Sequence, residues 1–274
     1  MNQQTLTDFP SYESPPVIEV VCGIRFKEII GFLAPHIGLL WQKFQPDYNE
    51  FSEHPNLVTP IETCGGQQNI EFRVDDKPPL PRVWFVHSKG NAVIQFQRDL
   101  FIYNWRKNSS LEEYPRFSVV FAHFLEHLEA FTKFISDNNL GELEPTQFEL
   151  TYINHIPKGD GWESTADVGK VFKDFSWNNC SSRFLPHPDV FQWRDSFNFP
   201  NDSGRLNTLI RKAKRTRDGE EVLLFELGAK GIPINKLEST SLQNWFNQAH
   251  EWIVKGFSDL TCDQIQKDIW LRKE

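Results

Sequence analysis

The fold is decided by residues 18–26, which read Ile18-Glu19-Val20-Val21-Cys22-Gly23-Ile24-Arg25-Phe26. Apolar side chains occupy every second position of this stretch. Because successive side chains of a strand point to opposite faces, the pattern predicts a strand with one buried face. That buried face is expected to consist of Ile18, Val20, Cys22, Ile24 and Phe26.

The residues that follow predict a helix, several strands and a second helix. Pro35 suits the first turn of a helix, and the apolar residues after it repeat at helical spacing. Residues 54–68 are rich in turn formers and predict a loop. The strands are expected at 70–74, 82–87, 92–97 and 100–106, with a hairpin turn at 88–91. A long helix is expected after Pro115, with an apolar stripe made of Phe117, Phe121, Phe124, Leu128, Phe131 and Ile135.

The same order of elements then begins again. A strand is expected at 146–156, a short helix at 165–175, strands at 190–199, 205–215 and 221–229, and a closing amphipathic helix up to Leu260. The two opening strands align without a gap, with Ile18 on Phe148, Glu19 on Glu149 and Arg25 on His155. This repeat predicts a duplicated chain. Its parts are a flexible segment 1–15, a first α+β repeat 16–141, a second α+β repeat 146–262 and a tail 263–274.

Strands joined by hairpins predict a curved antiparallel sheet, and two long helices with one apolar stripe each can cover only one of its faces. The expected fold class is therefore α+β, with a duplicated strand-helix-strands-helix unit and helices on one face. This arrangement is similar to the TATA-binding-protein-like and helix-grip folds, an analogy that carries no function by itself.

The uncovered face would combine charged, polar and apolar side chains. In the strand 100–106, Phe101, Tyr103 and Trp105 are expected to face the helices, which leaves Asn104 and Arg106 outward. Such a mixed surface suits a protein partner or a ligand. The candidate binding residues are Glu19, Arg25, Asn104, Arg106, Glu149 and His155. The alternative is an ordinary solvated sheet face with cross-strand ion pairs.

Composition places the chain among globular proteins of a reducing compartment. Its 274 residues are 39% hydrophobic and 24% charged, and the formal net charge is −8. The N-terminus lacks a secretory signal, and the apolar runs are too short to span a bilayer. Four cysteines without paired spacing do not form a disulfide framework. We expect a cytoplasmic protein that does not bind membranes.

One dense basic run offers an alternative function, nucleic-acid binding. Its candidate contact residues are Arg211, Lys212, Lys214 and Arg215, within the segment from Arg205 to Arg217. A basic hairpin on an antiparallel sheet could bind phosphates. The competing interpretation is a solvated hairpin whose charges are balanced by nearby acidic residues, in an acidic chain.

Signals for catalysis are sparse. His123-Phe124-Leu125-Glu126-His127 has the spacing of an inverted zinc-protease motif, which leaves a metal-dependent hydrolase as a third hypothesis. On a helix, however, Glu126 points away from the core, so two solvated histidines are the simpler interpretation. No serine-nucleophile motif or phosphate-binding glycine loop is present. Asn154 falls on the covered side of its strand beside Tyr152, as expected for a buried amide bonded to backbone groups. We assign no catalytic residue, metal or cofactor.

Several separated motifs resemble a family of sporadically distributed, uncharacterised bacterial proteins. These motifs span roughly residues 15–260 and include PPVIEVVCGIRF at 15–26, RVWF at 82–85, FIYNWR at 101–106, Tyr114-Pro115-Arg116 and TYINHI at 151–156. The resemblance implies no established activity or cofactor. The patchy distribution of that family resembles that of accessory genes, including phage-defence and toxin–antitoxin loci. The leading hypothesis is thus a non-enzymatic interaction module of such a system, which binds a partner or ligand on the open sheet face.

Overall fold

The computed structural model describes residues 9–57, 80–177, 182–232 and 239–273. Among these residues, nine antiparallel strands form one sheet in the order β3-β4-β5-β6-β2-β7-β10-β9-β8. The strands are β2 (Val17–Phe26), β3 (Glu50–His54), β4 (Arg82–Val86), β5 (Ala92–Gln97), β6 (Leu100–Arg106), β7 (Pro145–Pro157), β8 (Gln192–Asn198), β9 (Arg205–Lys214) and β10 (Glu221–Gly231). The expected α+β class with an antiparallel sheet is confirmed.

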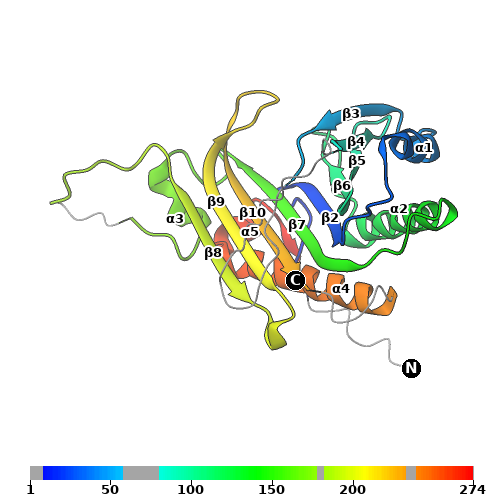
Figure 1. The fold of residues 1–274 in the computed structure, drawn as a ribbon. Coiled ribbons are helices and arrows are strands. Elements are labelled where there is room, and N and C mark those ends of the chain that lie inside the picture. The colour runs from blue at the N-terminus through cyan, green and yellow to red at the C-terminus, as the bar shows by residue number, and fades with distance from the viewer. Residues whose placement is uncertain (1–8, 58–79, 178–181, 233–238, 274) are drawn as a thin grey trace.

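The helices pack against one face of this sheet, which we call the helix face. They are α1 (Ala34–Phe44), α2 (Phe117–Asp137), α3 (Val168–Val171), α4 (Ser239–Leu260) and α5 (Asp263–Asp268). Figure 1 shows α1 beside β4 and β5, with α2 and α4 nearer the central strands. We call the opposite face, which carries Glu19, Val21 and Arg25, the outer face. No helix among the described residues is long and apolar enough to cross a membrane.

Aromatic rings fill the layer between helices and sheet. Phe101 of β6 stacks on Phe131 of α2, with 4.9 Å between ring centroids. Phe148 of β7 lies 6.0 Å from Phe246 of α4. All four rings are essentially buried, and each buried phenylalanine contributes about 1.5–3 kcal/mol of hydrophobic stabilisation. The stripe predicted from the sequence of α2 thus forms the helical side of the core.

The pairing of the two central strands has the symmetry of the aligned sequences. Val21 pairs with Thr151, Glu19 with Ile153 and Gly23 with Glu149. When the sequences are aligned with Ile18 on Phe148, Val21 falls on Thr151, so this pair maps onto itself. The same alignment places Glu19 on Glu149 and Gly23 on Ile153, so the other two pairs map onto each other. Beyond this centre, β6 lies beside β2 as β10 lies beside β7. The order of elements and the strand register therefore agree with a duplicated unit.

Most expected elements are present, with differences at the second short helix and at β3. The helix expected at 165–175 is a 3₁₀ turn (Thr165–Asp167) followed by α3, because the chain becomes extended at Phe172 and bridges to Thr261. β3 was not predicted, since its sequence Glu-Phe-Ser-Glu-His has a single large apolar residue. The expected strand 70–74, most of the loop 54–68, Cys64 and Cys180 lie outside the described residues.

The first strand contains a local irregularity that corrects its predicted buried face. The register shifts between Val17 and Glu19. Because of this bulge, Val17 joins the core in place of Ile18, and the alternation continues as predicted from Val20 to Phe26.

Residues 9–15 and 263–273 correct the prediction of a flexible segment 1–15 and a tail 263–274, while residues 1–8 and 274 lie outside the described residues. β1 (Ser11–Tyr12) pairs with β11 (Arg272–Lys273). The Tyr12 hydroxyl donates to Oε1 of Gln266 in α5, and Trp270 packs 4.8 Å from Phe257. Tyr12 and Trp270 are both buried. Residues 9–15 and 263–273 are thus packed parts of the fold, held by side chains whose spacing is too irregular to show a period.

Candidate functional site

All six candidate binding residues lie on the outer face, but much of their hydrogen-bonding capacity is used within the protein. Asn104 donates to Glu19 at 2.6 Å, and the Nε atom of Arg25 donates to Glu149 at 2.8 Å. Arg106 donates to the Gly90 carbonyl. Arg25 and Asn104 are each only 4% exposed. The structure therefore joins four of the six residues in two internal pairs.

A row of side-chain hydrogen bonds extends the first pair across four strands. Nη1 of Arg82 donates to Gln95, and Gln95 donates to Asn104, both at 2.8 Å. Asn104 then donates to Glu19 on β2. Burial raises the pKa of Glu19, and the hydrogen bond from Asn104 opposes this rise. Alternation placed Glu19 and Asn104 of this row on the outer face correctly but gave no sign that the side chains would connect.

His155, the remaining member of the set, is a partly buried imidazole. Burial lowers its pKa to about 4, and the nearby cations Arg215 and Arg211 act in the same direction. Its Nδ1 atom is buried without a hydrogen-bond partner. This ring is neutral at physiological pH and carries no charge for a partner.

The basic run lies on the hairpin of β9 and β10 and is largely balanced by acidic neighbours. Lys212 forms an ion pair with Glu221 at 2.8 Å. Arg215 pairs with both Asp218 and Glu220 in the hairpin loop. For Arg211 and Lys214 no ion pair with a described residue is found. The arrangement matches the solvated, charge-balanced hairpin more closely than a phosphate-binding surface.

The two histidines of the zinc-protease spacing lie on α2 in different environments. Nδ1 of His123 is 3.6 Å from Glu126 at the surface. Nε2 of His127 is hydrogen-bonded to the Tyr48 hydroxyl at 2.7 Å, and burial lowers its pKa to about 4. The described residues contain no group of three or more histidine, cysteine or acidic side chains that could hold a metal ion.

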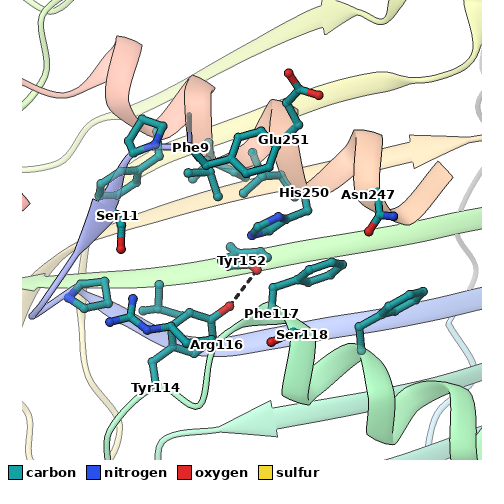
Figure 2. Close-up of a pocket in the computed structure, with 18 of the residues that line it drawn as sticks. Phe9, Ser11, Tyr114, Arg116, Phe117, Ser118, Tyr152, Asn247, His250 and Glu251 are labelled. Carbon is teal, nitrogen blue, oxygen red and sulfur yellow. Dashed lines mark hydrogen bonds between the residues drawn. The ribbon is translucent and has the colours of Figure 1, made fainter. Parts of the chain in front are cut away.

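A cavity of about 960 Å³ lies between α2 and α4 on the helix face, and we call it the interhelical cavity. α2 and α4 form opposite walls, β2, β7 and β10 form the floor, and residues 9–15 complete the rim. Figure 2 shows Phe117 and Ser118 on the α2 side and Asn247 and His250 on the α4 side. The volume suits a drug-sized organic molecule.

The floor presents two kinds of unused hydrogen-bonding capacity. The hydroxyls of Tyr114 and Tyr152 are 2.8 Å apart (Figure 2). Burial raises the pKa of both, so both are protonated, and one of their two protons has no role in the pair. Asn154 is 1% exposed, and its Nδ2 donates to the Phe225 carbonyl as the sequence suggested. Its Oδ1 atom, however, is buried and has no partner.

Aromatic rings line the sides of the cavity. His250 of α4 stacks on Phe117 of α2 with 4.1 Å between centroids and 6° between planes. Phe9 meets His250 edge-on at 5.9 Å. Burial lowers the pKa of His250 to about 4, and no hydrogen bond to either ring nitrogen is found among the described residues. A flat apolar ligand can therefore extend this stack without a charge on the imidazole.

The lining residues do not form a recognisable catalytic group. Among the described residues, neither Ser11 nor Ser118 is hydrogen-bonded to His250, and no cysteine lines the cavity. A nucleophile and its base would need to be within hydrogen-bond distance. The arrangement can hold a molecule through rings, one hydroxyl donor and one amide acceptor.

This cavity was not predicted from the sequence. Tyr114 and Arg116 belong to a motif noted in the sequence, and His250 is on the polar flank of the closing helix. Neither signal shows that α2 and α4 leave space between them. Comparison of the chain with protein-family models, with curated proteins and with solved structures finds no match, so the site is defined by its own geometry.

Proposed function

We propose that the protein binds a small organic molecule in the interhelical cavity and acts as a binding module rather than an enzyme. The observation that carries the proposal is the unpartnered Oδ1 atom of Asn154, because a buried acceptor without a partner costs about 1–3 kcal/mol. A ligand that donates a hydrogen bond would remove this cost. The spare proton of the Tyr114–Tyr152 pair adds a donor to the same floor.

Membership in the bacterial family named above would place this binding in an accessory system such as phage defence or a toxin–antitoxin pair. The binding of a partner on the outer face remains an alternative, supported by the exposed side chains of β8 and weakened by the internal pairs of Arg25 and Asn104. Nucleic-acid binding by the basic hairpin and metal-dependent hydrolysis have less support. Lys212 and Arg215 of the hairpin are held in ion pairs, and the described residues supply no third metal ligand.

A bulky side chain placed in the cavity is expected to weaken binding of a neutral apolar probe. Ala122 is exposed on α2 and lines the cavity, so Ala122→Trp should narrow the space without disturbing the core. N-phenyl-1-naphthylamine, titrated by its own fluorescence, should bind the wild-type protein and lose at least tenfold in affinity with this variant. The reason is that the indole occupies the volume that the naphthalene ring needs.

Glu129→Trp provides the matched control, because Glu129 is exposed on the same helix and does not line the cavity. This variant should bind the probe as the wild-type protein does. Absence of binding to the wild-type protein, or equal binding by both tryptophan variants, would refute the proposal.

A further inference from the structure

The wall of the interhelical cavity that belongs to α2 is positively polarised. The first N–H groups of an α-helix have no partner within the helix, and the helix dipole places partial positive charge there. α2 has no side-chain cap at Arg116 and no acidic residue in its first turn. No hydrogen bond to the N–H groups of Phe117 and Ser118 is found among the described residues. Both residues line the cavity.

Arg116 adds a full charge at the same place. Its exposed side chain lines the cavity beside Tyr114 (Figure 2). It forms no ion pair or hydrogen bond with any other described residue. Its backbone has φ 75° and ψ 154°, a conformation that a residue with a Cβ atom adopts at a cost of about 1–3 kcal/mol. The strained backbone thus places a guanidinium without an acidic partner at the start of α2.

The opposite wall does not cancel this charge. Glu251 of α4 is the one acidic residue among those that line the cavity, and its Oε1 accepts from Lys255 at 2.6 Å. His250 is neutral, as shown above. The cavity is therefore locally cationic in a chain whose formal net charge is −8. In such a chain an anionic ligand can be attracted only by a local arrangement of this kind.

We infer that the ligand of the interhelical cavity is an organic anion, with an aromatic or apolar body against the stacked rings of Phe117 and His250 and a carboxylate or phosphate group at Arg116 and the N-terminus of α2. This inference rests on the proposed function. The unpartnered Asn154 oxygen, almost fully buried in the same cavity, is an independent sign that the site takes a ligand. Phosphate and carboxylate groups commonly bind where free N–H groups and a cation meet.

The test compares two probes that differ in one sulfonate group. 1-Anilinonaphthalene-8-sulfonate is the anionic counterpart of N-phenyl-1-naphthylamine, and both report binding by fluorescence. The anionic probe should bind the wild-type protein at least tenfold more tightly than the neutral one. Arg116→Gln should weaken the anionic probe about tenfold and change the neutral probe by less than twofold.

Two further variants separate the anion site from general effects. Arg194→Gln removes an exposed arginine on β8, far in the sheet order from β2, and should leave both affinities unchanged. Ser118→Asp places a carboxylate in the first turn of α2, where it should raise the melting temperature and weaken the anionic probe. A fold damaged by Arg116→Gln would lower neutral-probe binding too, whereas Ser118→Asp tests the site without that risk.

The outcomes distinguish the two proposals. Equal affinity for both probes, unchanged in Arg116→Gln and in Ser118→Asp, would overturn the anion inference and leave the cavity as a binding site. Failure of both probes to bind the wild-type protein would overturn the proposed function. Anionic-probe binding that persists in Ala122→Trp would place the sulfonate outside the cavity and would also overturn the inference.

Discussion

Lowering the pH from 7 to 5 is expected to reduce the free energy of unfolding by about 5 kcal/mol. Burial lowers the pKa of His127, His155 and His250 to about 4, against 6.5 for an ordinary histidine. Between these values the unfolded chain binds protons at the three imidazoles and the folded protein does not. Stability is therefore complete above about pH 6.5 and is lost as the pH falls, by about 2 kcal/mol each for His127 and His250 at pH 5 and by about 1 kcal/mol for His155, whose greater exposure to solvent weakens the effect.

Two buried carboxyl groups change the stability in the opposite direction as the pH falls. Burial raises the pKa of Glu19 and of Glu226 above the ordinary 4.5. A carboxyl with a raised pKa favours the folded state at low pH, and this contribution is lost as the pH rises through the folded-state value. These residues offset part of the histidine effect at the acid end of the window and leave its direction unchanged.

Urea unfolding followed by tryptophan fluorescence at pH 7, 6 and 5 measures the effect. His250→Phe keeps a ring stacked on Phe117 and removes one titrating group, so it should shrink the loss between pH 7 and 5 by about one third. An equal loss in the variant and the wild-type protein would show that His250 is not buried as a neutral ring. Stability that is flat across this range would contradict the burial of all three.

The stripe of α2 and the alternation in β7 were predictable because the burial of these elements is one-sided. In β2 and β6 the side chains that face the helices were also placed correctly, although β6 is buried on both faces from Leu100 to Trp105. The bulge at Val17 escaped prediction because it depends on how β2 pairs with β7. The packing of Tyr12 and Trp270 escaped for a similar reason, since a contact between the two chain ends leaves no periodic trace.

The cavity could not be predicted because it depends on the spacing of helices that are far apart in sequence. Phe121 of α2 meets Phe246 of α4 at 5.0 Å and Phe117 meets His250 at 4.1 Å, and the cavity lies beside these contacts, where Arg116 and residues 9–15 also line it. The spacing of the lining residues along α2 or α4 alone does not distinguish them from other residues of an amphipathic helix. Alternation along β7 correctly assigned Asn154 to the helix face, but an unpartnered oxygen becomes visible only when every neighbour is placed.

Removal of Arg25 alone is expected to cost about 3–5 kcal/mol of folding free energy, because it leaves a carboxylate poorly compensated in a buried setting. The side chains of Arg25 and Glu149 are 5% and 15% exposed, and they pair at 2.8 Å. Gln147, which is fully buried, donates to the same Glu149 oxygen. Asp99 also pairs with Arg25, at 3.6 Å, but it is acidic and cannot replace the guanidinium. In Arg25→Met the amide of Gln147 would therefore be the main remaining partner of Glu149.

Replacing both members of the pair separates a structural role from a binding role. Arg25→Met with Glu149→Leu removes both charges and should recover most of the stability, because apolar residues often replace a buried ion pair at little cost. Denaturant midpoints of the wild-type, single and double variants give the coupling energy. A coupling near zero would mean that the pair is hydrated and its charges are available to a partner, as the docking hypothesis for the outer face requires. A coupling of several kcal/mol, with the double variant still able to bind the two naphthalene probes, would assign Arg25 and Glu149 to the fold and leave the interhelical cavity as the binding site.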